Sequence, residues 1–210
     1  MNRLRRTGVT LQTLHEKHFD HGTILAQTSR PGLTIPKRTT CTYDDLLQWI
    51  KPQAAKMLVN GLRDRIFVPP LVDVGRNAII PREPAPKITK ESSRIKAHQW
   101  QQAGAIFALH RALGRLWVPF QFDDGSVKRV IFEDIQILSL SKIPDDVYIS
   151  APVPQESDPS GQIIKLAWEK HGSKREDAIY IRCNIKSALR VNQVTIEGEK
   201  KKAASVLSRL

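Results

Sequence analysis

The sequence is poor in several features that define common classes of protein. It has only two cysteines among 210 residues, Cys41 and Cys183, which lie far apart and form no Cys-x-x-Cys pair. A disulfide framework is therefore excluded. No apolar run reaches the roughly 18 residues that a membrane-spanning helix needs. Apolar residues make up 40% of the chain and aromatic residues 6%, which is typical of one or two globular domains with a real core.

Acidic residues are also scarce, and the imbalance of charge is uneven along the chain. The net charge is +12. Residues 1–66 contain 11 Lys and Arg against 5 Asp and Glu, residues 67–164 contain 11 of each kind, and residues 165–210 again contain 11 against 5. Two basic ends around a neutral middle indicate a positive surface for a polyanion. A basic protein with an ordinary solvated charged surface would have the same composition.

The N-terminal region predicts two short strands joined by a polar loop. Apolar and polar residues alternate from Val9 to Leu14, and a second strand is expected over Thr23–Gln27. The three arginines of Met1–His15 are also typical of a transit peptide, but the strand is the preferred interpretation. Three histidines of the loop, His15, His18 and His21, recur at a spacing of three, and because no fourth ligand is evident we predict no metal site.

Helices and a linker are expected next. Thr42 is a suitable N-cap, and Asp44 and Asp45 suit the positive end of a helix dipole. Because Pro52 should interrupt a helix, we expect two helices, 43–50 and 52–64. Five prolines in 67–87 predict an extended interdomain linker, with a possible hairpin over 73–80.

A second domain should start near residue 88. A helix is expected over 99–116, ending at Gly114, after which the apolar pattern changes to a period of two. Residues 123–125 (Asp-Asp-Gly) predict a hairpin turn, residues 144–160 a loop, and 200–210 a short helix or basic tail. The candidate strands are 117–122, 127–137, 162–168, 179–183 and 187–196. Together these elements fit a small antiparallel barrel with a leading helix.

Several short motifs, in their order along the chain, resemble one enzyme family. The motifs are Thr7-Gly8-Val9-Thr10 and Phe19-Asp20-His21-Gly22, followed by the helical segment 43–62, the linker 68–90, the helical segment 100–117 and the basic closing segment 188–207. Together they resemble the C-terminal part of methionyl-tRNA formyltransferases of the fungal mitochondrial type. The Asn-x-His pair and the Ser-Leu-Leu-Pro segment of the family's catalytic core do not occur in this sequence, so we expect the cofactor-binding half to be missing.

The resemblance implies a fold and an activity. The fold would be an α/β remnant of the formyltransferase catalytic domain (1–66), a linker (67–87) and a mainly antiparallel β-barrel, open and OB-like, with a leading helix (88–210). The activity would be transfer of a formyl group from 10-formyltetrahydrofolate to the amino group of methionyl initiator tRNA in mitochondrial translation initiation. Asp20 would be the catalytic carboxylate. The implied protein is a mitochondrial matrix monomer without a membrane segment.

The basic C-terminal region is the strongest indication of a partner, because Lys and Arg on a barrel edge attract a phosphate backbone. The predicted tRNA-binding residues are Lys186, Arg190, Lys200, Lys201, Lys202 and Arg209. Trp100, Trp117 and Trp168 could stack on bases, but their apolar surroundings favour core packing. Two alternatives stay open: a non-catalytic tRNA-binding module derived from the enzyme, and a different formyl-transfer or formyl-folate hydrolysis enzyme, which the basic C-terminal region disfavours.

Overall fold

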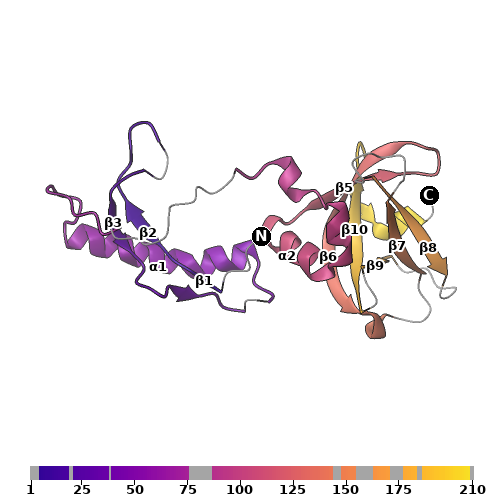
Figure 1. Cartoon of the computed structure of the whole chain (residues 1–210), viewed down its shortest axis with the longest axis horizontal. Helices are drawn as coiled ribbons and strands as arrows, with labels where there is room; N and C mark the ends of the chain where they lie inside the picture. The colour runs from indigo at the N-terminus through magenta and orange to yellow at the C-terminus, as the bar shows by residue number, and fades with distance from the viewer. Residues whose placement is uncertain are drawn as a thin grey trace. The chain divides into compact units, whose positions relative to one another are not determined.

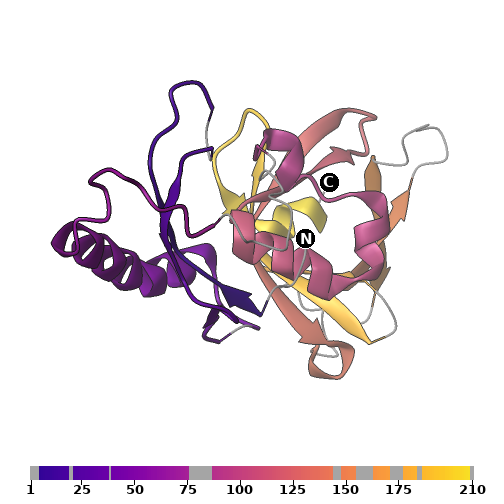
Figure 2. The ribbon, with the colours of Figure 1, turned by 60° about the vertical axis from the view of Figure 1, so that its left-hand side comes forward.

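A computed structural model describes residues 5–18, 21–37, 39–75, 87–143, 148–154, 163–170, 177–183 and 186–208 of the chain. The chain divides into two compact units, Met1–Lys87 and Ile88–Leu210, which Figures 1 and 2 show in indigo to purple and in magenta to yellow. None of the helices described is long and apolar enough to cross a membrane.

Two small antiparallel sheets and one long helix form the first unit. Strand β1 (Arg6–Thr7) pairs with β4 (Leu33–Thr34), and β2 (Thr10–Gln12) pairs with β3 (Ile24–Gln27). The expected strands at Val9–Leu14 and Thr23–Gln27 are therefore confirmed with shorter bounds, whereas the β1–β4 pair was not predicted. Helix α1 (Tyr43–Arg63) contacts β2 and β3.

Helix α1 is continuous, so the prediction of two helices separated at Pro52 is wrong. Thr42 caps the helix as expected: its hydroxyl accepts from the backbone N–H of Asp45, whose carboxylate accepts from the N–H of Thr42. Proline removes one backbone hydrogen bond from a helix. Here strong helix formers lie on both sides of Pro52 and the capping box fixes the start, so the loss of that bond does not end the helix.

Little of the expected linker is described. Residues 76–86 lie outside the described residues, and with them most of the hairpin expected over 73–80. Before this gap, Val74 donates a backbone hydrogen bond to Ile24, and a Cβ added at Gly75 would lie 2.4 Å from the Ile24 side chain. Residues 67–75 therefore lie against β3 at that point.

Helical segments open the second unit. The turns η1 (Lys90–Ser93) and η2 (Ala97–Gln101) precede α2 (Ala103–Leu113). The single helix expected over 99–116 is thus a 3₁₀ turn followed by a shorter α-helix. Gly114 ends α2 as predicted, because its φ of +78° suits glycine and few other residues.

A seven-stranded sheet makes up the rest of the second unit. The strands are β5 (Leu116–Gln121), β6 (Val127–Ser139), β7 (Tyr148–Pro154), β8 (Ile164–Lys170), β9 (Ile179–Arg182), β10 (Ser187–Ile196) and β11 (Lys202–Ala203). Their order is β11-β10-β6-β5-β8-β7-β9, and β9 also pairs with β10. Most pairings are antiparallel; β5–β8 and β7–β9 are parallel.

Four details of the second unit bear on the predictions. The hairpin turn after β5 is confirmed, with Gly125 at φ +81°. Strand β7 falls inside the predicted loop 144–160, so that prediction is wrong for 148–154. Its prolines, Pro152 and Pro154, pair only with β8, whereas β9 pairs with Ile149 and Ser150; proline is tolerated in a strand where one edge needs no donor. Residues 200–210 include β11 and the turn η4 (Ala204–Ser208).

The core of the second unit lies between the sheet and α2. Phe132, Ile106 and Leu116 are completely buried there. The chain is therefore of the mixed α/β type, with a mainly antiparallel sheet behind a leading helix, as expected. Its description as an open, OB-like barrel stays a prediction.

Candidate functional site

The loop between β2 and β3 was expected to carry the catalytic carboxylate. Asp20 lies outside the described residues, but the loop's two ends are described. Two hydrogen bonds between Thr13 and Thr23 join these ends. The Thr13 N–H donates to the Thr23 carbonyl over 3.0 Å, and the Thr23 N–H donates to the Thr13 hydroxyl over 2.9 Å. A Cβ added at Gly22 would lie only 1.7 Å from the Thr13 carbonyl oxygen, so only glycine fits there.

Three histidine rings gather in the same loop. The ring centroids of His15, His18 and His21 lie 5.3–6.2 Å apart, and all three residues are exposed. His15 Nδ1 accepts hydrogen bonds from the backbone N–H groups of Lys17 and His18, which requires this nitrogen to carry no proton. Within the described ranges, no group of three or more His, Cys, Asp or Glu could hold a metal ion.

The first unit also has a pocket of about 570 Å³ between α1 and β3. Its polar lining consists of Gln53, Lys56, Asn60 and Asp64, all from α1 or its C-cap. The remaining lining residues are Leu25, Ala26, Pro52, Met57, Gly61 and Ile66. One ammonium and one carboxylate on an apolar wall do not form a recognisable catalytic pair, and we assign the pocket no reaction.

The basic turn after β10 is the second predicted site, and one of its lysines is tied to the sheet. Lys201 Nζ lies 2.7 Å from a carboxylate oxygen of Glu133 on β6. The same carboxylate accepts from the Thr195 hydroxyl over 2.6 Å and lies 3.6 Å from Arg115 Nε. Its side chain is only 7% exposed, so Lys201 balances a nearly buried charge.

A backbone irregularity places Glu133 at this position. In the β6–β10 ladder, Phe132 pairs with Val194 and Asp134 with Gln193, which leaves Glu133 as an extra residue in β6. Burial acts to raise the pKa of Glu133, but the hydrogen bonds from Lys201 and Thr195 and the attraction of Arg115 and Lys201 outweigh it. The pKa of Glu133 is therefore lowered from its ordinary value. Glu133 was not predicted from the sequence.

The other predicted tRNA-binding residues differ in their surroundings. Lys202 Nζ lies 2.5 Å from Glu199, and this hydrogen bond lowers the pKa of Glu199. Lys200 is exposed, and no ion pair holds it among the residues that the structure describes. Lys186, just before β10, is exposed, Arg190 on β10 is half-buried, and Arg209 lies outside the described residues. Of the lysine run, Lys200 alone thus presents its charge without an acidic partner in the described structure.

The tryptophans separate into two kinds. Trp100 is 5% exposed and packs edge-on against Phe132, with ring centroids 6.3 Å apart, so its expected place in the core is confirmed. Trp117 is half-buried and faces away from the core on β5, so core packing was the wrong expectation for it. For Trp168 only the backbone, in β8, is described.

Comparison with known proteins identifies similar sequences. No protein-family model matches the chain. The methionyl-tRNA formyltransferase of Geobacillus thermodenitrificans is 28% identical over 210 aligned residues, which cover 97% of this chain and 53% of that protein. The mitochondrial methionyl-tRNA formyltransferase of Saccharomyces cerevisiae is 31% identical over 63% of this chain and 38% of its own length, and that of Bos taurus is 32% identical over 70% and 36%.

These similarities confirm the resemblance expected from the motifs. The chain is similar to part of a methionyl-tRNA formyltransferase, and it spans about half the length, or less, of the curated relatives it matches.

Proposed function

We propose that this chain, which resembles part of a methionyl-tRNA formyltransferase, takes part in formylating methionyl initiator tRNA. The observation that carries the proposal is the similarity over 97% of the chain to a protein of that name. The formyl donor would be 10-formyltetrahydrofolate. A mitochondrial location is supported by the names of the yeast and bovine relatives.

The reaction would proceed by acyl transfer. The methionyl amine attacks the formyl carbon, a tetrahedral oxyanion forms, and the bond from that carbon to the folate nitrogen breaks as the nitrogen takes up a proton, which completes the new amide. Asp20 would accept the proton that the amine loses, which is general-base catalysis. The loop geometry supports such a role: the Thr13–Thr23 hydrogen bonds and Gly22 fix the loop ends on either side of the aspartate.

The second unit, with its mainly antiparallel sheet, would bind the tRNA. Its support is the basic region around β10 and β11, with Lys186, Arg190, Lys200 and Lys202 as the phosphate-binding residues; Arg209, which lies outside the described residues, is a further candidate from the sequence. Lys201 would serve mainly to fix the turn, because its ammonium is bound to the nearly buried Glu133.

Two assays test this function. Filter binding of initiator tRNA to the 210-residue chain, at several salt concentrations, measures affinity and its salt dependence. Incubation with methionyl-tRNA and 10-formyltetrahydrofolate measures transfer. Formylation by the chain that is lost in Asp20→Asn would support the enzyme; absence of tRNA binding would refute it.

A non-catalytic tRNA-binding module is the second candidate. The observation that favours it is the basic region of the second unit, where Lys186 and Lys200 are exposed. It predicts tRNA binding without formylation, and equal binding by the wild type and the Asp20→Asn variant. Charge reversal of Lys200 should weaken binding and reduce its salt dependence under either candidate.

A further inference from the structure

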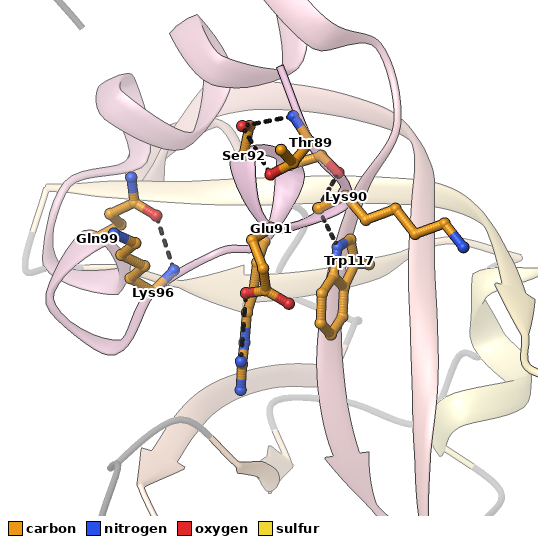
Figure 3. Close-up of polar contacts among 9 residues, drawn as sticks. Thr89, Lys90, Glu91, Ser92, Lys96, Gln99 and Trp117 are labelled. Carbon is orange, nitrogen blue, oxygen red and sulfur yellow. Dashed lines mark hydrogen bonds and ion pairs between the residues drawn. The ribbon is translucent and has the colours of Figure 1, made fainter. Parts of the chain in front are cut away.

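Trp117 is held in a fixed orientation on the outer face of β5. Its indole N–H donates to the Lys90 carbonyl over 2.8 Å. The η1 turn that carries this carbonyl is itself closed by hydrogen bonds, from the Thr89 N–H to the Ser92 hydroxyl over 3.0 Å and from the Ser93 hydroxyl to Lys90 O over 2.9 Å (Figure 3). A ring that needs no rearrangement can bind a flat partner at a lower entropic cost.

Two guanidinium groups lie close to this ring. Arg94 Cζ is 5.1 Å and Arg129 Cζ is 5.9 Å from the ring centroid. Arg94 reaches Trp117 because its backbone forms a bridge with it beside β5, and Arg129 lies on β6 opposite Pro119. We call Trp117, Arg94 and Arg129 the indole platform. Planar cations next to an indole form a surface that favours anions and aromatic rings together.

The arginines of the indole platform are only weakly engaged by protein acids. Arg94 lies 3.5 Å from Glu91 and Arg129 lies 3.8 Å from Glu197, and these acids are 67% and 57% exposed. Ion pairs with exposed acids at such distances are weak. The Nε atoms of both arginines are shielded from solvent and have no hydrogen-bond partner in the described structure. A ligand would therefore be held by the terminal nitrogens of the two guanidinium groups, whose acidic neighbours lie at the long distances of 3.5 Å and 3.8 Å.

We propose that the indole platform binds a single-stranded segment of RNA, with an unpaired base stacked against Trp117 and a neighbouring phosphate held by Arg94 and Arg129. Unpaired bases stack on aromatic side chains and guanidinium planes, and a duplex hides its base faces. Lys90, whose carbonyl accepts the indole N–H, is itself exposed. This inference rests on the proposed function only in naming RNA as the ligand, and it adds a contact site away from the lysine turn.

The test uses the full chain and a fluorescein-labelled oligouridylate of ten nucleotides, followed by fluorescence anisotropy. Because stacking accounts for a large part of such affinity, Trp117→Leu should weaken binding roughly 5- to 100-fold. Trp117→Phe, which keeps an aromatic ring, should stay within about threefold of the wild type. Lys142→Ala removes an exposed charge in the separate turn η3 (Leu140–Lys142) and should bind like the wild type, which shows that the oligonucleotide is not held by the general surface charge. Equal binding by the wild type and Trp117→Leu would overturn the proposal.

Two further readouts keep the test independent of folding and of the proposed function. Ultraviolet cross-linking of a 5-bromouridine oligonucleotide to the unaltered chain should label the peptide that contains Trp117; labelling elsewhere alone would overturn the platform. An RNA duplex of the same length should bind more weakly than the single strand, and equal or tighter binding of the duplex would also overturn it. If the chain binds initiator tRNA but not the oligouridylate, the platform fails and the proposed function stands; the reverse result refutes the function and leaves the platform.

Discussion

Removing the Lys201 ammonium tests whether Glu133 anchors the basic turn. In Lys201→Met, the carboxylate keeps the Thr195 hydroxyl at 2.6 Å and Arg115 at 3.6 Å but loses its closest cation, at 2.7 Å. Hydrogen bonds to charged groups stabilise proteins by about 1.5–3 kcal/mol. Lys201 is 48% exposed, so solvent screening places the expected loss at the lower end, about 1.5–2 kcal/mol.

The assay is thermal unfolding of the second unit, followed by tryptophan fluorescence. A Trp49→Phe background removes the tryptophan of α1, so the remaining tryptophans all lie in the second unit. A loss of this size corresponds to a Tm lower by roughly 5–10 °C. The double variant Lys201→Met with Glu133→Gln should recover part of the loss, giving a coupling of about 1 kcal/mol.

The pH dependence of stability gives a second test of the contact between Lys201 and Glu133. The pKa of Glu133 is lower in the folded state than its ordinary value of 4.5. A carboxylate of this kind contributes stability that is fully present above 4.5 and is lost as pH falls through the folded-state pKa. The Tm difference between Lys201→Met and its parent should therefore be full at pH 7 and should shrink below pH 4.5. Equal Tm values at pH 7, or a difference that persists unchanged at pH 3, would refute the anchoring argument.

Three other substitutions follow from the described contacts. Gly22→Ala should destabilise the first unit by about 1–3 kcal/mol, because the new Cβ would collide with the Thr13 carbonyl; faster hydrogen exchange in β2 and β3 would show it. Thr42→Ala should lower the stability of the first unit by about 1 kcal/mol, because it removes the cap on the Asp45 N–H. On heating, the variant should lose its helical circular dichroism signal at a lower temperature than the wild type. Phe132→Ala, at a completely buried site, should cost about 3–5 kcal/mol in urea unfolding; a smaller loss would mean that the core is not packed as described.

The sequence predicted the elements whose signals are local. The cap at Thr42, the turn at Gly125 and the end of α2 at Gly114 each depend on a few adjacent residues, and the structure confirms all three. Strand β10 was predicted with its bounds because its buried residues alternate over most of its length. Strand β7 was missed because prolines usually indicate a loop. Its prolines are compatible with a strand because they pair with β8 only, and this pairing cannot be read from the sequence.

The Glu133 anchor was missed for a related reason, although the sequence carries a signal for it. Inward-facing residues of β6 alternate up to Phe132, and then two acids precede the next buried residue, Ile135. The opposite strand has the same break between Val191 and Val194. Buried apolar residues that are three positions apart within a strand are typical of a bulge. Here both paired strands have such a break, and the polar Glu133 lies at a position that a regular alternation of buried and exposed residues does not predict.

Ion pairs within the folded protein reduce what a run of lysines can contribute to RNA binding. Lys200, Lys201 and Lys202 are equivalent in the sequence, but Lys201 faces Glu133 on another strand and Lys202 faces Glu199. Each cation that keeps its protein partner releases no counterion from RNA, so the salt dependence of binding reports fewer contacts than the lysine run suggests. The formal charge of +12 is therefore an upper bound on what the surface offers a phosphate backbone, and weakly paired arginines such as Arg94 and Arg129 become comparatively more important.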